Sequence, residues 1–410
     1  MDDGARAKSD GRWLETAEQI GRQIVDSAIW HAERCNWIGA DTIGPGAAGR
    51  PVTYHRALNA SLYSGTAGIS VFLAHVYAKA EDRTFRDVAL GGLRQALAVA
   101  RRDLPRGLFT GAPGVALSAL RAAELLDAPG LAADALSLAD AALTERPSEH
   151  DLLVGAAGEA IAFLRLANAT RRPRYADAAM RLGERLFAGA QPENTGWSWP
   201  SAAQSGARNL TGFSHGAAGV AYAFLLLYEA TSANIYRNGA QAAFAYERAH
   251  YDHERRNWPD FRELTEGASP GFPVLWCHGA AGIAVSRLAG WRLLGDGRCR
   301  EEARAALVTT QTALREDLED PAASFCLCHG TAGNADVLLE STLLLSEEYR
   351  SRHALVQEAA RMGEDRHRPR GSWPCGVRGG QSPSLMLGLA GIGMFFLRLH
   401  DPALPTPLAP

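Results

Sequence analysis

A series of seven Gly-x-x-Gly pairs, spaced 44 to 63 residues apart, constrains the fold of this chain more than any other feature, and two further pairs, at Gly46 and Gly376, lie outside the series. Each of the seven pairs is followed by an apolar run of about ten residues with helical periodicity, which predicts a buried helix. Amphipathic segments that alternate with these runs predict outer helices at 16–33, 85–103, 131–145, 174–189, 234–250, 299–316 and 351–364. The seven pairs begin at Gly65, Gly111, Gly155, Gly216, Gly279, Gly330 and Gly388.

Seven apolar helices that alternate with seven amphipathic ones cannot bury their faces singly and must stack side by side. We therefore expect an all-α fold, an α/α toroid in which a double ring of helices is built from seven helix pairs. Glycines at the helix starts let backbones approach closely and leave unpaired N–H groups facing one end of the ring. That end is the predicted place for a functional site.

One domain is expected over residues 13–400 of the 410, with a disordered N-terminus at 1–12 and a flexible tail at 401–410. The 42 Lys and Arg against 45 Asp and Glu leave no broad basic surface for nucleic acid or anionic membrane. The polar N-terminus has no signal-peptide pattern, and no stretch is long enough to span a bilayer. Strand signals are few and are limited to loop pieces such as 195–200.

The strongest chemical signal is a pair of Cys-His-Gly turns, 276–279 and 326–330, each placed at the start of a glycine pair. If the repeats stack, both turns lie on the same rim in neighbouring units. Two thiolates and an imidazole are the ligands of a zinc site with an open fourth position. The predicted ligands are Cys277, Cys328 and His329.

The remaining cysteines are interpreted as structural. Six cysteines in 410 residues are too sparse for a disulfide framework and indicate a reducing cytoplasm. Cys326 is expected in the core because Cys328, rather than Cys326, shares the offset of Cys277 from its glycine pair. Cys375 is expected in a packed turn, and Cys35 and Cys299 in outer helices.

Two further residues are candidates for proton transfer. His215 occupies the same place before its glycine pair as His278 and His329, and Asp151 stands four residues ahead of Gly155. Either can serve as an acid or base on the rim. Equally, His215 can be a hydrogen-bonded core residue and Asp151 a helix cap. No nucleotide-binding loop or kinase motif is present, so ATP chemistry is not expected.

The combined motifs resemble the lanthionine synthetase C-like family. The resemblance runs from about Ser61 to Leu399 and rests on four segments: His215-Gly-Ala-Ala-Gly219, Trp276-Cys-His-Gly-Ala-Ala-Gly282, Cys328-His-Gly-Thr-Ala-Gly-Asn334 and Ser384-Leu-Met-Leu-Gly-Leu-Ala-Gly-Ile392. It implies an α/α toroid with a zinc ion on Cys277, Cys328 and His329. It also implies acid or base roles for His215 and Asp151.

The resemblance further implies cyclisation of a dehydrated precursor peptide, which makes a separate dehydratase the expected partner. Peptide cysteine thiolates would add to dehydroalanine or dehydrobutyrine to form thioether rings. Two positions depart from the pattern: His278 replaces a tyrosine found in many bacterial cyclases, and Pro273 replaces an arginine. These departures leave the zinc ligands intact and bear on enolate stabilisation and on the substrate class. His278 is a third candidate for the catalytic set.

Three alternatives to peptide cyclisation stay open from the sequence. The first is addition of a free thiol such as glutathione to dehydroamino acids. The second is a zinc-dependent thiol alkyltransferase on a related α/α barrel, and the third is a non-catalytic scaffold that holds a peptide.

Overall fold

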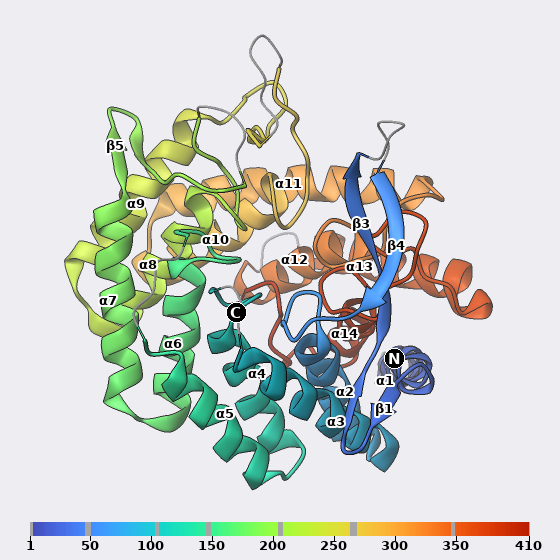
Figure 1. Cartoon of the computed structure of the whole chain (residues 1–410). Helices are drawn as coiled ribbons and strands as arrows, with labels where there is room; N and C mark the ends of the chain where they lie inside the picture. Colours follow the sequence, from blue (N-terminus) through green and yellow to red (C-terminus); the bar gives the residue numbers. More distant parts are fainter. Residues whose placement is uncertain are drawn as a thin grey trace.

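The computed structural model describes residues 3–45, 51–102, 106–144, 149–203, 208–262, 269–345 and 349–409. Figure 1 looks along the axis of a double ring of helices. The inner ring consists of α2 (Thr66–Ala80), α4 (Ala112–Leu125), α6 (Ala156–Thr170), α8 (Ala217–Thr231), α10 (Ala280–Leu294), α12 (Thr331–Leu344) and α14 (Leu389–His400). Each inner helix contacts the next, and α14 contacts α2, which closes the ring.

An outer helix packs against each inner helix. The outer helices are α1 (Asp3–Asp26) on α14, α3 (Arg83–Ala100) on α2, α5 (Pro129–Ala141) on α4, α7 (Pro173–Gly189) on α6, α9 (Asn234–Ala249) on α8, α11 (Gly297–Glu319) on α10 and α13 (Tyr349–His367) on α12. The predicted toroid of seven helix pairs is therefore confirmed over the described residues.

Steric contacts explain why glycine is needed at the second position of each pair. The first glycine of each pair directly precedes an inner helix, and the second lies in its first turn. A Cβ atom on any of the second glycines would lie 1.6 to 2.1 Å from the backbone carbonyl oxygen six residues earlier. Any side chain there would push the turn away from the helix start. These second glycines are Gly68, Gly114, Gly158, Gly219, Gly282, Gly333 and Gly391.

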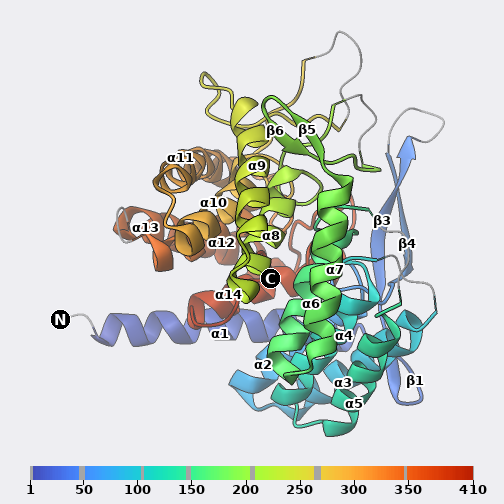
Figure 2. The same ribbon diagram turned by 90° about the vertical axis from the view of Figure 1, so that its left-hand side faces the viewer.

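Short strands lie outside the helical rings. The pairs are β1 (Ile29–His31) with β2 (Arg34–Asn36), β3 (Ile38–Pro45) with β4 (Pro51–Ala57), and β5 (Gln191–Glu193) with β6 (Gly196–Ser198), all antiparallel. Figure 2 shows β3 and β4 along one side of the molecule, with the N-terminus on the opposite side. The strand signal at 195–200 corresponds to β6, whereas the longer hairpin of β3 and β4 was not predicted.

The N-terminal region differs from the sequence-based expectation. Helix α1 begins at Asp3 and ends at Asp26, so it starts and ends earlier than the predicted helix at 16–33 and includes residues expected to be disordered. Trp13 on α1 is 2 % exposed and packs on Phe396 of α14. The prediction that Cys35 lies in an outer helix is wrong, because Cys35 lies in β2 and its thiol contacts the Val88 carbonyl of α3.

The residues after α14, expected to form a flexible tail, are packed in the structure. The C-terminus lies near the middle of the ring (Figure 1). Leu408 is 1 % exposed, and its carbonyl accepts a 2.9 Å hydrogen bond from Trp276 Nε1. Thr406 donates to Asp336 of α12. These apolar and polar contacts explain why the segment does not extend into solvent. None of the described helices combines the length and apolar character needed to cross a bilayer.

The steric role of the glycine pairs leads to a stability prediction. In Gly114→Ala, the new Cβ would lie 1.6 Å from the Leu108 carbonyl oxygen, so the turn must move. We expect a loss of about 3 kcal/mol in the free energy of unfolding, measured by urea titration. Gly130→Ala in α5 is the control, because nothing lies within 4 Å of its Cβ. Equal stability of the two variants would contradict the steric explanation.

Candidate metal centre

Backbone hydrogen bonds join the turns that precede the inner helices. We define the rim residues as those two places before the first glycine of each pair: Tyr63, Phe109, Leu153, Ser214, Cys277, Cys328 and Met386. Neighbouring rim residues are linked by N–H···O bonds of 2.9 to 3.3 Å, each running from one amide to the carbonyl of the next rim residue. Among these residues, all of them described, Cys277 and Cys328 are the one neighbouring pair without such a bond.

The predicted metal ligands meet at this gap. The ligand atoms of Cys277, Cys328 and His329 all lie within 4.8 Å of one another. Ligand atoms of a tetrahedral zinc ion with bonds of about 2.0–2.3 Å lie roughly 3–4 Å apart, so small side-chain movements suffice for binding. In the part of the chain that the structure describes, this is the one group of its kind. The cluster can therefore hold a metal ion.

Surrounding groups orient the cluster. His329 Nε2 lies 3.0 Å from the Gly376 carbonyl oxygen, so a proton on Nε2 can be donated there and Nδ1 is left to bind a metal. The Tyr63 hydroxyl donates a 2.9 Å hydrogen bond to Cys328 Sγ. Burial and the nearby thiols raise the pKa of Tyr63 well above its ordinary value, so the phenol stays a donor. A bound imidazole and thiolate with such outer partners are typical of zinc sites.

One of the two cluster thiols is prepared for deprotonation, whereas the hydrogen bond to Cys277 and burial raise the pKa of Cys328 well above its ordinary value. A hydrogen bond from the Cys328 thiol lowers the pKa of Cys277 to about 7, although burial opposes this shift. Cys277 can therefore lose its proton near neutral pH, as metal binding requires.

The other cysteines lie outside the cluster. Cys326 is fully buried, and its sulfur contacts His329 both at the backbone amide, at 3.5 Å, and through a hydrogen bond with the imidazole. The Cys375 thiol points to the Ser382 carbonyl at 3.7 Å, and Cys299 is buried in α11. All six cysteines are free thiols.

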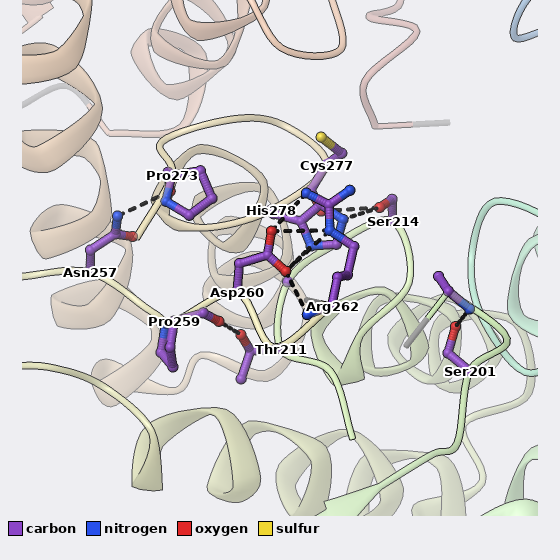
Figure 3. Close-up of polar contacts among 12 residues, drawn as sticks. Ser201, Thr211, Ser214, Asn257, Pro259, Asp260, Arg262, Pro273, Cys277 and His278 are labelled. Carbon is purple, nitrogen blue, oxygen red and sulfur yellow. Dashed lines mark hydrogen bonds and ion pairs between the residues drawn. The ribbon is translucent and has the colours of Figure 1, made fainter. Parts of the chain in front are cut away.

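The turn before α10 places Cys277 and His278 through local contacts. Gly279 has φ +88°, a conformation that favours glycine, and a Cβ there would lie 1.7 Å from the Pro273 carbonyl oxygen. Asn257 accepts from the Ala280 amide at 2.9 Å and donates to Pro273 at 3.0 Å (Figure 3). The side chain of Asn257 thus ties the start of α10 to the loop that precedes it.

Asp151 and His215 form a pair on the same rim. His215 Nδ1 lies 2.7 Å from Asp151 Oδ2, and the Val154 amide donates to the other carboxylate oxygen at 2.8 Å. The His215 side chain is 17 % exposed and that of Asp151 is 3 % exposed. Both predicted residues therefore meet, with the histidine open to the rim and the carboxylate behind it.

A buried glutamate supports the turn that carries His215. Glu247 of α9 accepts hydrogen bonds from the Gly212 amide at 3.0 Å and the Ala218 amide at 2.9 Å. Burial raises the pKa of Glu247 to about 7. These two amides lie on either side of His215, so Glu247 positions the histidine through the backbone.

His278 lies between Ser214 and an aspartate–arginine pair, as Figure 3 shows. Its Nε2 is 3.4 Å from Ser214 Oγ and its Nδ1 is 3.9 Å from Asp260 Oδ1. Arg262 donates to Asp260 at 2.6 Å. Burial, followed by the charge of Arg262, lowers the pKa of His278 to about 3, so its ring is neutral. The ring stacks on His215 with centroids 6.0 Å apart.

Sequence reasoning missed Tyr63, Asp260 and Arg262. Tyr63 carried a usable signal, because it occupies the rim position shared by Cys277 and Cys328. Asp260 and Arg262 carried none, since they lie in an irregular loop and reach His278 through tertiary contacts.

Comparisons with known proteins agree with this geometry. The family model "Lanthionine synthetase C-like protein" matches residues 56–408. A segment of 136 residues is 28 % identical to the lacticin 481/lactococcin biosynthesis protein LcnDR2 of Lactococcus lactis subsp. lactis. The match covers 32 % of this chain and only 14 % of that protein's length.

Solved structures share the fold at low sequence identity. Nisin cyclase superposes with a TM-score of 0.64 at 18 % identity, covering 84 % of this chain and 89 % of the other. The Lin0763 protein from Listeria innocua gives a TM-score of 0.53 at 12 % identity, covering 94 % and 97 %. The family model spans most of the chain and includes both glycine-flanked cysteine turns. The protein belongs to the lanthionine synthetase C-like family.

Proposed function

We propose that the protein is a zinc-dependent cyclase that adds peptide cysteine thiols to dehydroalanine or dehydrobutyrine in a dehydrated precursor peptide. The observation that carries this proposal is the meeting of Cys277, Cys328 and His329 on the rim that also holds the Asp151–His215 pair. Such a cluster with an open position is suited to a third thiolate. A separate dehydratase would supply the substrate, and a reducing cytoplasm suits the free thiols.

Zinc held by Cys277, Cys328 and His329 would keep an incoming peptide thiol deprotonated at neutral pH. The sulfur then forms a bond to the β-carbon while the alkene π electrons move towards the carbonyl oxygen. A proton must next reach the α-carbon. The thiol proton lost at the start balances the proton added at the end, so a ring forms with no change in mass.

His215 is the proposed proton donor. Asp151 holds Nδ1, which leaves Nε2 as the nitrogen that can hand a proton to the α-carbon. Asp151 fixes the ring orientation and stabilises the protonated imidazole. His278 is neutral and 1 % exposed, so we assign it a positioning role beside His215 rather than proton transfer.

Arg262 brings positive charge to this side of the site. Asp260 fixes the guanidinium of Arg262 beside His278, and the Arg262 side chain is 38 % exposed. A cation here would stabilise negative charge that develops on the substrate carbonyl oxygen. Arg262 can thereby supply the positive charge of the family arginine that Pro273 replaces.

The activity test uses a dehydrated peptide with one cysteine, zinc-loaded protein, glutathione and a thiol-alkylating reagent added at the end. A cyclase gives a product of unchanged mass that resists alkylation. A free-thiol transferase instead adds the mass of glutathione, and a scaffold leaves the thiol open to alkylation. Either of these last two results would refute the cyclase proposal.

The metal site predicts one zinc ion per chain. Cys277→Ala, Cys328→Ala and His329→Ala should each lose most of the zinc in elemental analysis, whereas Cys326→Ala should keep it. The stacked helices bury a continuous core, so the ring should stay folded without metal. Compared with the zinc-loaded protein, the metal-free protein should exchange its amide hydrogens faster mainly in the turns of Cys277 and Cys328, because no backbone hydrogen bond joins these two rim residues. Wild-type zinc in Cys277→Ala would rule out the assignment.

If His215 donates the proton, its replacement should slow cyclisation without loss of the metal. His215→Asn should keep its zinc and slow cyclisation by about 10²–10⁴-fold, the usual range for a lost general acid. Asp151→Asn should cost less, because it removes only the orienting charge. Wild-type cyclisation by His215→Asn would shift the donor to another group or to water.

The hydrogen bond from Tyr63 predicts a change in metal affinity. Tyr63→Phe removes a donor to Cys328 while keeping the aromatic ring, so the fold should not change. Loss of such an outer partner lowers zinc affinity by about 10–100-fold. Competition with a chromophoric chelator measures this, and unchanged affinity would show that the hydroxyl does not tune the site.

A further inference from the structure

A groove of about 970 Å³ opens beside the metal cluster. Residues 372–381 line it, together with Arg370, His367, the metal ligand His329 and part of segment 320–324. We call it the basic groove. Its volume is at the upper end of those of ligand pockets and suits a short peptide segment better than a single small thiol.

The groove wall is held by hydrogen bonds to neighbouring elements. The Phe325 amide donates to the Pro374 carbonyl at 2.7 Å, and the Gly376 amide donates to Leu387 at 2.8 Å. The β3–β4 hairpin holds the other end, where the Ala40 amide donates to the Gln381 carbonyl at 2.9 Å. A wall tied at both ends needs little reorganisation on binding.

The charges in the groove are unbalanced. Arg370 and Arg378 are exposed, and neither guanidinium has a hydrogen-bond or ion-pair partner among the described residues, although the Arg378 carbonyl accepts a hydrogen bond from the Thr53 hydroxyl. The one carboxylate in the lining, Asp320, accepts a 2.8 Å hydrogen bond from the Ala322 amide. Burial, followed by the charges of Arg366 and Arg370, lowers the pKa of His367, so it adds no positive charge near neutral pH. The groove thus offers two guanidinium groups to an anionic ligand.

The groove reaches one of the three proposed metal ligands. His329 lines the groove, and Gly376, another lining residue, accepts the hydrogen bond from its ring. A peptide bound along the groove would therefore have part of its chain next to Cys277, Cys328 and His329.

We propose that the basic groove binds an acidic segment of the peptide substrate, with Asp or Glu side chains on Arg370 and Arg378. Guanidinium groups pair with carboxylates through parallel hydrogen bonds, which fix the orientation as well as the position of the segment. A cysteine near the bound segment would then reach the metal cluster. That the ligand is a substrate rests on the proposed function, whereas acidic-peptide binding itself does not.

The test is a binding measurement on the zinc-loaded full chain. The probe is a fluorescein-labelled peptide of twelve residues with four Glu spaced by Ser and Gly, and its partner has Gln in place of Glu. Neither contains a cysteine or a dehydroamino acid, so the result does not depend on cyclisation. In fluorescence anisotropy at low salt, the Glu peptide should bind with at least tenfold higher affinity than the Gln peptide. Added salt should weaken the binding of the Glu peptide.

Variants locate the binding. Arg370→Gln and Arg378→Gln should each weaken binding about 3–10-fold, in line with one lost charged contact each. The matched control is Arg361→Gln, at an exposed arginine on α13 whose guanidinium has no partner among the described residues, and this variant should bind the Glu peptide normally. Equal binding of the two peptides, or equal effects of Arg361→Gln and Arg378→Gln, would overturn the proposal. So would displacement of the Glu peptide by glutathione at the same carboxylate concentration, which would indicate a small-thiol site.

Failure of cyclisation with intact Glu-peptide binding would count against the proposed function alone.

Discussion

Close contact between a helix start and the carbonyl of the preceding turn is the constraint on which this structure depends. At each inner helix, a glycine leaves room for a carbonyl oxygen that no side chain would tolerate. The contact bends the chain sharply, so that every turn comes to the same end of the ring. Backbone hydrogen bonds then connect one turn to the next around the rim. Packing of the apolar helices supplies the stability, but these turns determine where side chains can meet.

The candidate site follows from that arrangement. Cys277 and Cys328 occupy equivalent rim positions in neighbouring repeats, so stacking brings together two thiols that are 51 residues apart. His215, His278 and His329 stand one place further along in three consecutive repeats. A regular backbone therefore converts a spacing in sequence into a cluster in space. The cysteine pair lies where the chain of rim hydrogen bonds is interrupted, and a metal ion would join the two turns there.

Much of the fold could be predicted from the sequence, because it depends on local patterns. The glycine pairs and helical periodicity indicate both rings, and the shared offset of Cys277 and Cys328 picks out two cysteines that lie in one cluster with His329. Which of the cysteines bind metal stays a prediction. Features that arise from tertiary contacts could not be predicted. The 2.7 Å pairing of Asp151 with His215 links residues 64 positions apart, and Arg262 reaches His278 through an irregular loop. Cys35 was misplaced because nothing in its local pattern indicates the β1–β2 hairpin.

The rim hydrogen bonds use only main-chain atoms, and this separates architecture from chemistry. The same position carries a phenol, a benzyl group, two aliphatic or thioether chains, a hydroxyl and two thiols, yet the link between turns is the same at six of seven places. Side chains at these positions are thus interchangeable as far as ring closure is concerned. A toroid of this kind can acquire, lose or move a reactive centre by substitutions at a few equivalent rim positions, while the supporting helices keep their sequence and packing.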